Sequence, residues 1–192
     1  MRQIHHRSRR LDPDTSGVVI DITPEAAGWP LIGFTVRQIA AGDRWEGDTG
    51  GEEHCLVLLA GECRVRWNDG PFHRVGPREH VFASYPHAVY LPPGVAFVVD
   101  ADQHTELADC RAPSTSAHPA RVIDPEHCGY EVRGGGNATR QIVDVLPPSA
   151  AADRLMICEV FTPAGNWSSY PPHKHDVDAP PAEVDLDEVY YF

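Results

Sequence analysis

The sequence has no long apolar run and little positive charge. None of its 192 residues fall in an apolar stretch of about 18, so it predicts no membrane-spanning helix. The basic residues 1–10 lack the apolar centre of a secretory signal, and we expect a frayed or loosely paired end there. With 16 Lys and Arg against 28 Asp and Glu, the formal net charge is −12. This balance argues against nucleic acid or an anionic membrane as a partner.

The sequence also has no CxxC pair, although it contains five cysteines. An odd number of unpaired cysteines predicts free thiols, and cysteines of this kind are more often buried than catalytic. Free thiols are typical of a reducing compartment, so we expect a cytoplasmic protein.

No segment has the pattern of a long amphipathic helix, and the scattered 18 Pro and 16 Gly favour short elements joined by turns. Glu25–Gly28 could form one short helical turn. Runs rich in Val, Ile, Leu and aromatic residues predict strands. These are Gly17–Ile22, Leu31–Ile39, His54–Ala60, Glu62–Trp67, Ala88–Leu91 and Val95–Val99. Turns at Gly61 and at Pro92–Gly94 predict two hairpins. The whole pattern indicates an all-β sandwich or barrel of antiparallel strands.

A Pro- and Ser-rich stretch, Pro113–Pro125, suggests a division of the chain into domains at residues 1–124 and 125–192. Further strands are predicted at Gln141–Leu146 and Arg154–Thr162. The segment Glu188–Phe192 resembles a strand in mid-course, with no turn after it. Because such a strand needs a neighbour on its edge, we expect the second domain to be incomplete in this chain.

The strongest local signal for chemistry is the pair His173 and His175. In a strand, residues spaced i and i+2 point to the same face, about 7 Å apart. Two imidazoles on one face suit a divalent metal such as zinc, manganese, iron or nickel. We choose Glu188 as the carboxylate ligand because it opens the alternating run Glu188, Tyr190 and Phe192. Glu183 and Asp187 remain alternatives.

These residues carry a resemblance to a known family. The block "GNWSSYPPHKHD" at Gly165–Asp176, with "EVYYF" at 188–192, is similar to the 5-deoxy-glucuronate isomerases of myo-inositol breakdown. Those enzymes form a bicupin group with the 4-deoxy-5-keto-uronate isomerases of pectin breakdown. Similarity continues upstream in "REHVFASYPHAVYLPPG", "RAPS" and "RGGGNATRQI", and spans the chain after about its first fifteen residues.

The resemblance implies a bicupin with two jelly-roll barrels, the second truncated. It also implies a zinc or manganese ion in the second barrel. The metal ligands would be His173, His175 and Glu188, with a further His that lies beyond residue 192. The implied reaction converts 5-deoxy-D-glucuronate to 5-dehydro-2-deoxy-D-gluconate, so the expected partner is a small sugar acid, and a homo-oligomer remains open. The proton-transferring base is left open between a metal-bound hydroxide and a residue outside this chain.

Three alternatives stay open. They are the pectin-pathway uronate isomerase, a non-catalytic cupin that binds a sugar acid, and a cupin dioxygenase. Arg133 and Arg140 could bind a substrate carboxylate, although strand-end arginines are more often solvated. Residues Trp167–Tyr170 could line a sugar pocket or simply pack. The histidines of the first domain, including His54, do not reproduce the metal pattern, so we expect that domain to be metal-free.

Overall fold

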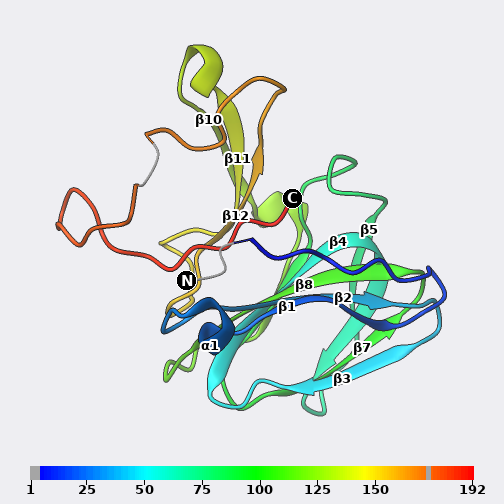
Figure 1. Ribbon diagram of the computed structural model, residues 1–192. Helices are drawn as coiled ribbons and strands as arrows, with labels where there is room; N and C mark the ends of the chain where they lie inside the picture. Colours follow the sequence, from blue (N-terminus) through cyan, green and yellow to red (C-terminus); the bar gives the residue numbers. More distant parts are fainter. Residues whose placement is uncertain (1–4, 172–173) are drawn as a thin grey trace.

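The computed structural model describes residues 5–171 and 174–192, and almost all of its regular structure is β (Figure 1). The all-β prediction is therefore confirmed. The single α-helix, α1 (Pro24–Ala27), is the short turn expected from the sequence. Among the described residues, no helix has the length and apolarity needed to cross a membrane.

Nine strands form the first body, and every pairing among them is antiparallel. One sheet has the order β1-β2-β8-β4-β6-β9, and a second consists of β3, β7, β4 and β5. The bounds are β1 (Gly17–Ile22), β2 (Gly33–Ile39), β3 (Arg44–Asp48), β4 (Glu52–Trp67), β5 (His73–Arg78), β6 (Ala88–Leu91), β7 (Ala96–Ala101), β8 (Thr105–Pro113) and β9 (Arg121–Ile123). The two sheets enclose an apolar core, to which Leu56, Leu107 and Val99 contribute fully or almost fully buried side chains. The two sheets share β4 and enclose this core as the walls of an antiparallel barrel.

Strand β4 runs for 16 residues and belongs to both sheets. The predicted hairpin at Gly61 is therefore wrong. A bulge between Leu58 and Ala60 and a left-handed backbone at Gly61 (φ +96°) bend the strand without reversing it. A Cβ atom on Gly61 would lie 2.1 Å from the carbonyl oxygen of His104, so only glycine fits this close approach.

The predicted hairpin at Pro92–Gly94 is also wrong, because the strands on either side of it do not pair. Strand β6 pairs with β4 and β9 in one sheet, whereas β7 pairs with β3 and β4 in the other. The turn therefore carries the chain from one wall of the barrel to the opposite wall.

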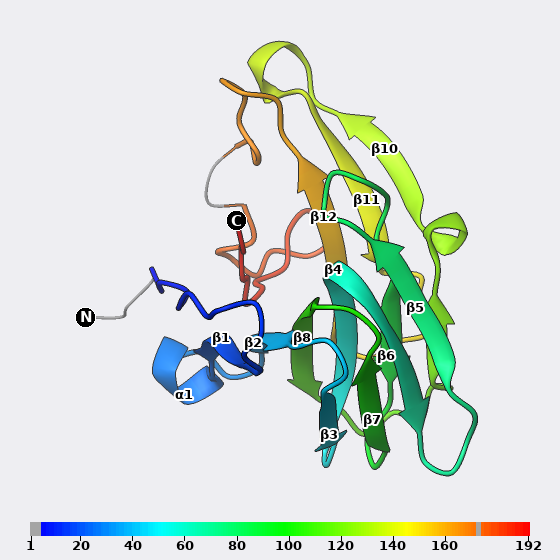
Figure 2. The same cartoon turned by 90° about the vertical axis from the view of Figure 1, so that its right-hand side faces the viewer.

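A separate three-stranded sheet has the order β10-β11-β12 and lies beside the barrel (Figure 2). Its strands are β10 (Gly129–Arg133), β11 (Arg140–Leu146) and β12 (Ile157–Phe161), with 3-10 turns at Pro125–His127 and Gly136–Ala138. Val143 and Leu146 of this sheet are fully buried in one core with Phe34 and Val57 of the barrel. Because the barrel and the three-stranded sheet share this core, the division at residue 124 remains a prediction.

The segment Glu188–Phe192 is not a paired strand, so that prediction is wrong. Side chains rather than backbone hydrogen bonds hold it against the barrel. The ring of Tyr191 lies 5.6 Å from that of Phe34, and Val189 packs against the shared core. Just before it, a carboxylate oxygen of Asp187 accepts a hydrogen bond from the backbone nitrogen of Leu31 at 2.9 Å.

Candidate functional site

His175 lies in a turn and not in the strand that the spacing predicted. Its backbone is left-handed, with φ 72°, and its carbonyl accepts a hydrogen bond from Leu186 N at 3.0 Å. An isolated bridge between Ala179 and Glu183 closes the same loop. His173 lies outside the described residues, so the predicted convergence of the two imidazoles remains a prediction.

The imidazole of His175 has a defined orientation. Its Nδ1 lies 3.2 Å from the carbonyl oxygen of Val184. A carbonyl can only accept, so Nδ1 donates in this contact, and in the neutral ring Nε2 carries the lone pair. A backbone carbonyl that fixes the imidazole in this way is common behind histidines that bind metals. The ring is therefore in the form that could bind a metal through Nε2.

Glu183 supplies the carboxylate next to His175. It accepts a hydrogen bond from the backbone nitrogen of His175 at 2.5 Å and forms an ion pair with Lys174 at 2.7 Å. The hydrogen bond from Lys174, followed by that from His175, lowers the pKa of Glu183. The carboxylate is therefore ionised at neutral pH, as a metal ligand must be. The sequence had kept Glu183 as an alternative to Glu188.

Glu188 lies in a different environment, near Cys158 of β12. Burial is the main cause that raises the pKa of the Cys158 thiol, and the charges of Asp144 and Glu188 add to it. Asp144 and Cys158 are direct partners across β11 and β12. Within the described part of the chain, no hydrogen bond or ion pair joins Glu188 to His175. The predicted set of His173, His175 and Glu188 therefore stays a prediction.

A metal fits this region only in part. His175 and Glu183 are neighbouring candidate ligands, but both oxygens of Glu183 already accept hydrogen bonds, from the backbone nitrogen of His175 and from Lys174. Within residues 5–171 and 174–192, no group of three or more His, Cys, Asp or Glu side chains is placed to hold a metal ion.

The two arginines considered for a substrate carboxylate have different surroundings. Arg133 is half exposed and forms an ion pair with Glu131 on its own strand. Arg140 is buried, and its Nη1 donates to the carbonyl of Ala138 at 3.1 Å. Arg140 therefore shapes the turn between β10 and β11, and of the two only Arg133 presents its charge to solvent.

Sequence reasoning missed the buried carboxylate of Glu53, which fastens the segment before β12 to the barrel. Its Oε1 accepts hydrogen bonds from the backbone nitrogens of Arg154 (2.6 Å) and Leu155 (2.7 Å). Its Oε2 accepts from Asp153 N at 2.9 Å and from the Tyr90 hydroxyl at 2.8 Å. Burial, and then the bond to Glu53, raise the pKa of the Tyr90 phenol. The sequence offers little local signal for this role, because Glu53 stands between Glu52 and His54, before the apolar run that begins at Cys55.

Arg78 at the end of β5 makes a second missed connection. Its guanidinium is fully buried and forms a bidentate ion pair with Glu159 of β12, with both N–O distances at 2.7 Å. It also donates to the carbonyls of Leu58, Val81 and Ser84. Together, Arg78 and Glu53 fix β12 and the start of the loop toward His175 relative to the barrel.

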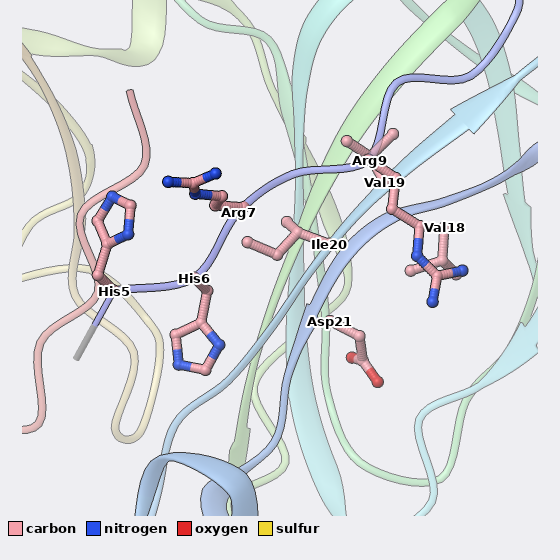
Figure 3. A pocket seen from close by; sticks show the side chains of 8 residues that line it. All are labelled: His5, His6, Arg7, Arg9, Val18, Val19, Ile20 and Asp21. Atoms are coloured by element: carbon pink, nitrogen blue, oxygen red, sulfur yellow. The ribbon is translucent and has the colours of Figure 1, made fainter. Parts of the chain in front are cut away.

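Two cavities of the described chain are not lined by His175. One, of about 540 Å³, is formed by residues 5–9 against β1, and Figure 3 shows His5, His6 and Arg7 beside Ile20 and Asp21. The other, of about 360 Å³, lies between residues 81–85 and the three-stranded sheet, where it is lined by Gln141 of β11 and Phe161 of β12. Neither is lined by His175 or Glu188.

An antiparallel barrel of two sheets that share β4, packed against a separate three-stranded sheet, places the protein in the cupin class. More narrowly, the chain belongs to the KduI/IolB family, whose sequence model matches residues 5–192. It is 43% identical over 180 residues to a 5-deoxy-glucuronate isomerase of Geobacillus kaustophilus and 44% identical to one of Geobacillus thermodenitrificans. Each match covers 93% of this chain, but only 65% and 66% of the respective relatives.

Solved structures agree with this membership. An IolB-like protein from Salmonella typhimurium LT2 has 38% identity and a TM-score of 0.86, over 93% of this chain and 67% of that protein. A putative glyoxylate induced protein from Pseudomonas aeruginosa shares the fold, with a TM-score of 0.57 over 74% of this chain and 54% of that protein at 16% identity.

Proposed function

We propose that the protein is an aldose–ketose isomerase that converts 5-deoxy-D-glucuronate to 5-dehydro-2-deoxy-D-gluconate. The observation that carries this proposal is 43–44% identity over 180 residues to relatives named 5-deoxy-glucuronate isomerase. The chain spans about 65% of the length of those relatives, so the activity is carried over to it as a proposal. The substrate would be a small sugar acid of myo-inositol catabolism, and the free cysteines support a cytoplasmic location.

The proposed cofactor is a divalent metal, zinc or manganese, held by His173, His175 and Glu188. Glu183 is an alternative carboxylate because of its place beside His175. Such a metal would stabilise negative charge that develops on the oxygens of C1 and C2 during proton transfer. The carbonyl of Val184 would keep the His175 ring in its metal-binding tautomer. Lys174 would hold Glu183 in its ionised form.

The test is incubation of the purified protein with 5-deoxy-D-glucuronate while the aldehyde proton is followed by NMR. We expect the keto product, its loss with a chelator and its return on addition of zinc or manganese. His175→Gln should abolish turnover, whereas the control His118→Gln, in the Pro-rich connection, should retain it. Failure of the folded, metal-loaded protein to convert the substrate would refute the proposal. Conversion of 4-deoxy-5-keto-uronate instead would favour the pectin-pathway reaction, and binding without turnover would favour a sugar-acid-binding cupin.

A further inference from the structure

The inner face of the barrel carries a polar cluster at one end of an otherwise apolar core. Residues Ile39, Leu56 and Leu107 line this core from β2, β4 and β8. Since side chains two residues apart in a strand share a face, Arg37, His54 and Asp109 belong to the same inner face. Thr35 and Arg111 follow by the same alternation, and Thr35 is the direct partner of Asp109. The cluster thus spans three neighbouring strands.

The two acidic groups of the cluster are already engaged. Asp109 lies 2.9 Å from Nδ1 of His54, and both side chains are almost fully buried, with 5% and 7% exposure. Asp21 on β1 accepts a hydrogen bond from the Thr35 hydroxyl at 2.6 Å. Its contact with Arg111 is long, at 3.4 Å. Neither carboxylate therefore gives the arginines of the cluster a short hydrogen bond.

The basic groups keep unused donor and acceptor capacity. Among the described residues, Nε of Arg37, Nε of Arg111 and Nε2 of His54 are buried without a hydrogen-bond partner. The guanidinium of Arg37 stacks on the indole of Trp45 at 4.7 Å, which fixes its plane without using its N–H groups. Burial is the largest cause that lowers the pKa of Arg37. The charge of Arg111 also lowers this pKa, whereas the charges of Asp109 and Asp21 raise it. A bound anion would relieve this repulsion.

A glycine makes room for the second guanidinium. A Cβ atom on Gly33 would lie 3.0 Å from Nε and 3.2 Å from Nη2 of Arg111. The side chain of Arg111 therefore lies over Gly33 at the barrel mouth, where it remains 23% exposed. Arg37 is also partly exposed, although Nε of each arginine is buried.

We propose that Arg37 and Arg111 form a binding site for a small carboxylate at the mouth of this barrel, separate from the candidate metal site. Two guanidinium groups with free N–H donors suit the two oxygens of a carboxylate. His54 directs Nδ1 to Asp109, and its buried, unpartnered Nε2 is left to form a hydrogen bond with a ligand hydroxyl. A hydroxy acid would therefore bind more tightly than a simple carboxylate. Occupation requires no catalysis and no metal.

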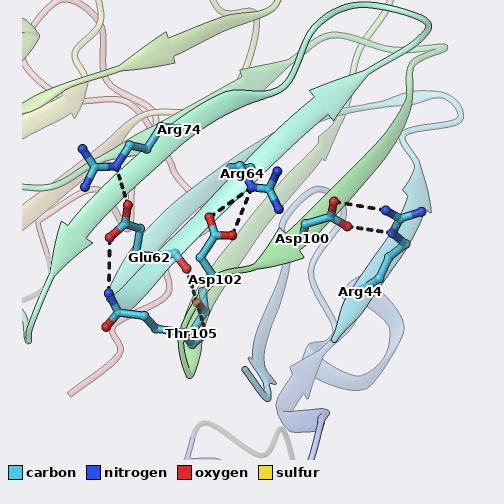
Figure 4. A network of polar contacts seen from close by, with 8 residues as sticks. Arg44, Glu62, Arg64, Arg74, Asp100, Asp102 and Thr105 are labelled. Carbon is cyan, nitrogen blue, oxygen red and sulfur yellow. Dashed lines mark hydrogen bonds and ion pairs between the residues drawn. The ribbon is translucent and has the colours of Figure 1, made fainter. Parts of the chain in front are cut away.

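The test is isothermal titration of the full chain with D-glucuronate at low salt, in excess of a chelator that carries no carboxylate, with acetate and inorganic phosphate as parallel probes. We expect saturable binding of D-glucuronate with one site per chain, weaker binding of acetate, and at least a tenfold loss in Arg37→Gln and in Arg111→Gln. The control is Arg64→Gln, which removes the same charge from the outer wall. There Arg64 pairs with Asp102 at 3.0 Å (Figure 4).

Absence of one-site binding, or equal affinity in Arg37→Gln and the unmodified protein, would overturn the proposal. Tighter binding of phosphate than of D-glucuronate would overturn the assignment to carboxylates. If an arginine variant is poorly folded, its melting temperature is measured with and without saturating D-glucuronate, and the difference between the two is taken as the shift. A shift as large as that of the unmodified protein would then also overturn the proposal. Because chelator is present throughout, the result is independent of isomerase activity.

Discussion

Replacement of the buried carboxylate Glu53 by glutamine should lower the free energy of unfolding by about 3 kcal/mol or more. Glutamine has the same shape, so it leaves no cavity, but it presents one acceptor oxygen where the carboxylate has two. The carboxylate accepts four hydrogen bonds, three of them from backbone nitrogens of residues 153–155. About two donors would lose their acceptor, and each bond to a buried charged group contributes about 1.5–3 kcal/mol.

Urea denaturation followed by circular dichroism measures this loss. For a slope of about 2 kcal/mol/M, the midpoint should fall by about 1.5 M. The matched control is Tyr90→Phe, which removes only the hydroxyl bond to Glu53 and should cost about 1 kcal/mol. A Glu53→Gln midpoint within about 0.2 M of the unmodified protein, with an unchanged slope, would refute the role assigned to this carboxylate.

Three further outcomes are expected. Arg78→Lys cannot keep the bidentate pair with Glu159 and should cost about 3–5 kcal/mol in the same urea assay; a cost below about 1 kcal/mol would contradict that pairing. A thiol reagent should modify Cys158 alone in the native protein, because this residue is the exposed cysteine among those described. The reaction should be slower than that of a free thiol, because desolvation of the sulfur by the atoms around it raises the pKa of the thiol. Fast labelling of several cysteines would contradict the fold. Because the pKa of Glu183 is lowered in the folded state, its stabilisation should be present above the ordinary pKa of glutamate and lost as the pH falls through the lowered value. NMR of the Lys174 ammonium and of the loop amides should report this, and loss of the contact at a higher pH would contradict it.

The strands could be predicted from the sequence because their signals are local. Gly17–Ile22 and Ala88–Leu91 were predicted with the bounds that the structure has. Alternating or continuous apolar residues define such strands without knowledge of their partners. The path of β4 could not be predicted in this way. Gly61 lies where the partners of β4 change from β8 and β6 to β7 and β5, and the paired residues of β7 and β8 come 30 to 61 positions later in the chain.

The candidate site was predictable only where its contacts are short-range. Glu183 is eight residues from His175, and the sequence had included it among the possible ligands. The pairs that position the surrounding sheet join residues 81 to 102 positions apart, as in Arg78 with Glu159 and Glu53 with Leu155. Hydrophobic periodicity cannot predict such a pair, because the residues next to each partner in the sequence do not indicate that the partner is buried. The turn at His175 was missed because the i, i+2 spacing was interpreted as a strand.

The passage of β4 through both walls of the barrel has a consequence for how the barrel can open. Its first half hydrogen-bonds to β8 and β6, and its second half to β7 and β5. Separation of the two walls would break the ladder on one half of a continuous backbone and strain the other. Opening of the barrel is therefore expected to be a single cooperative event, with Gly61 as the only glycine within the shared strand.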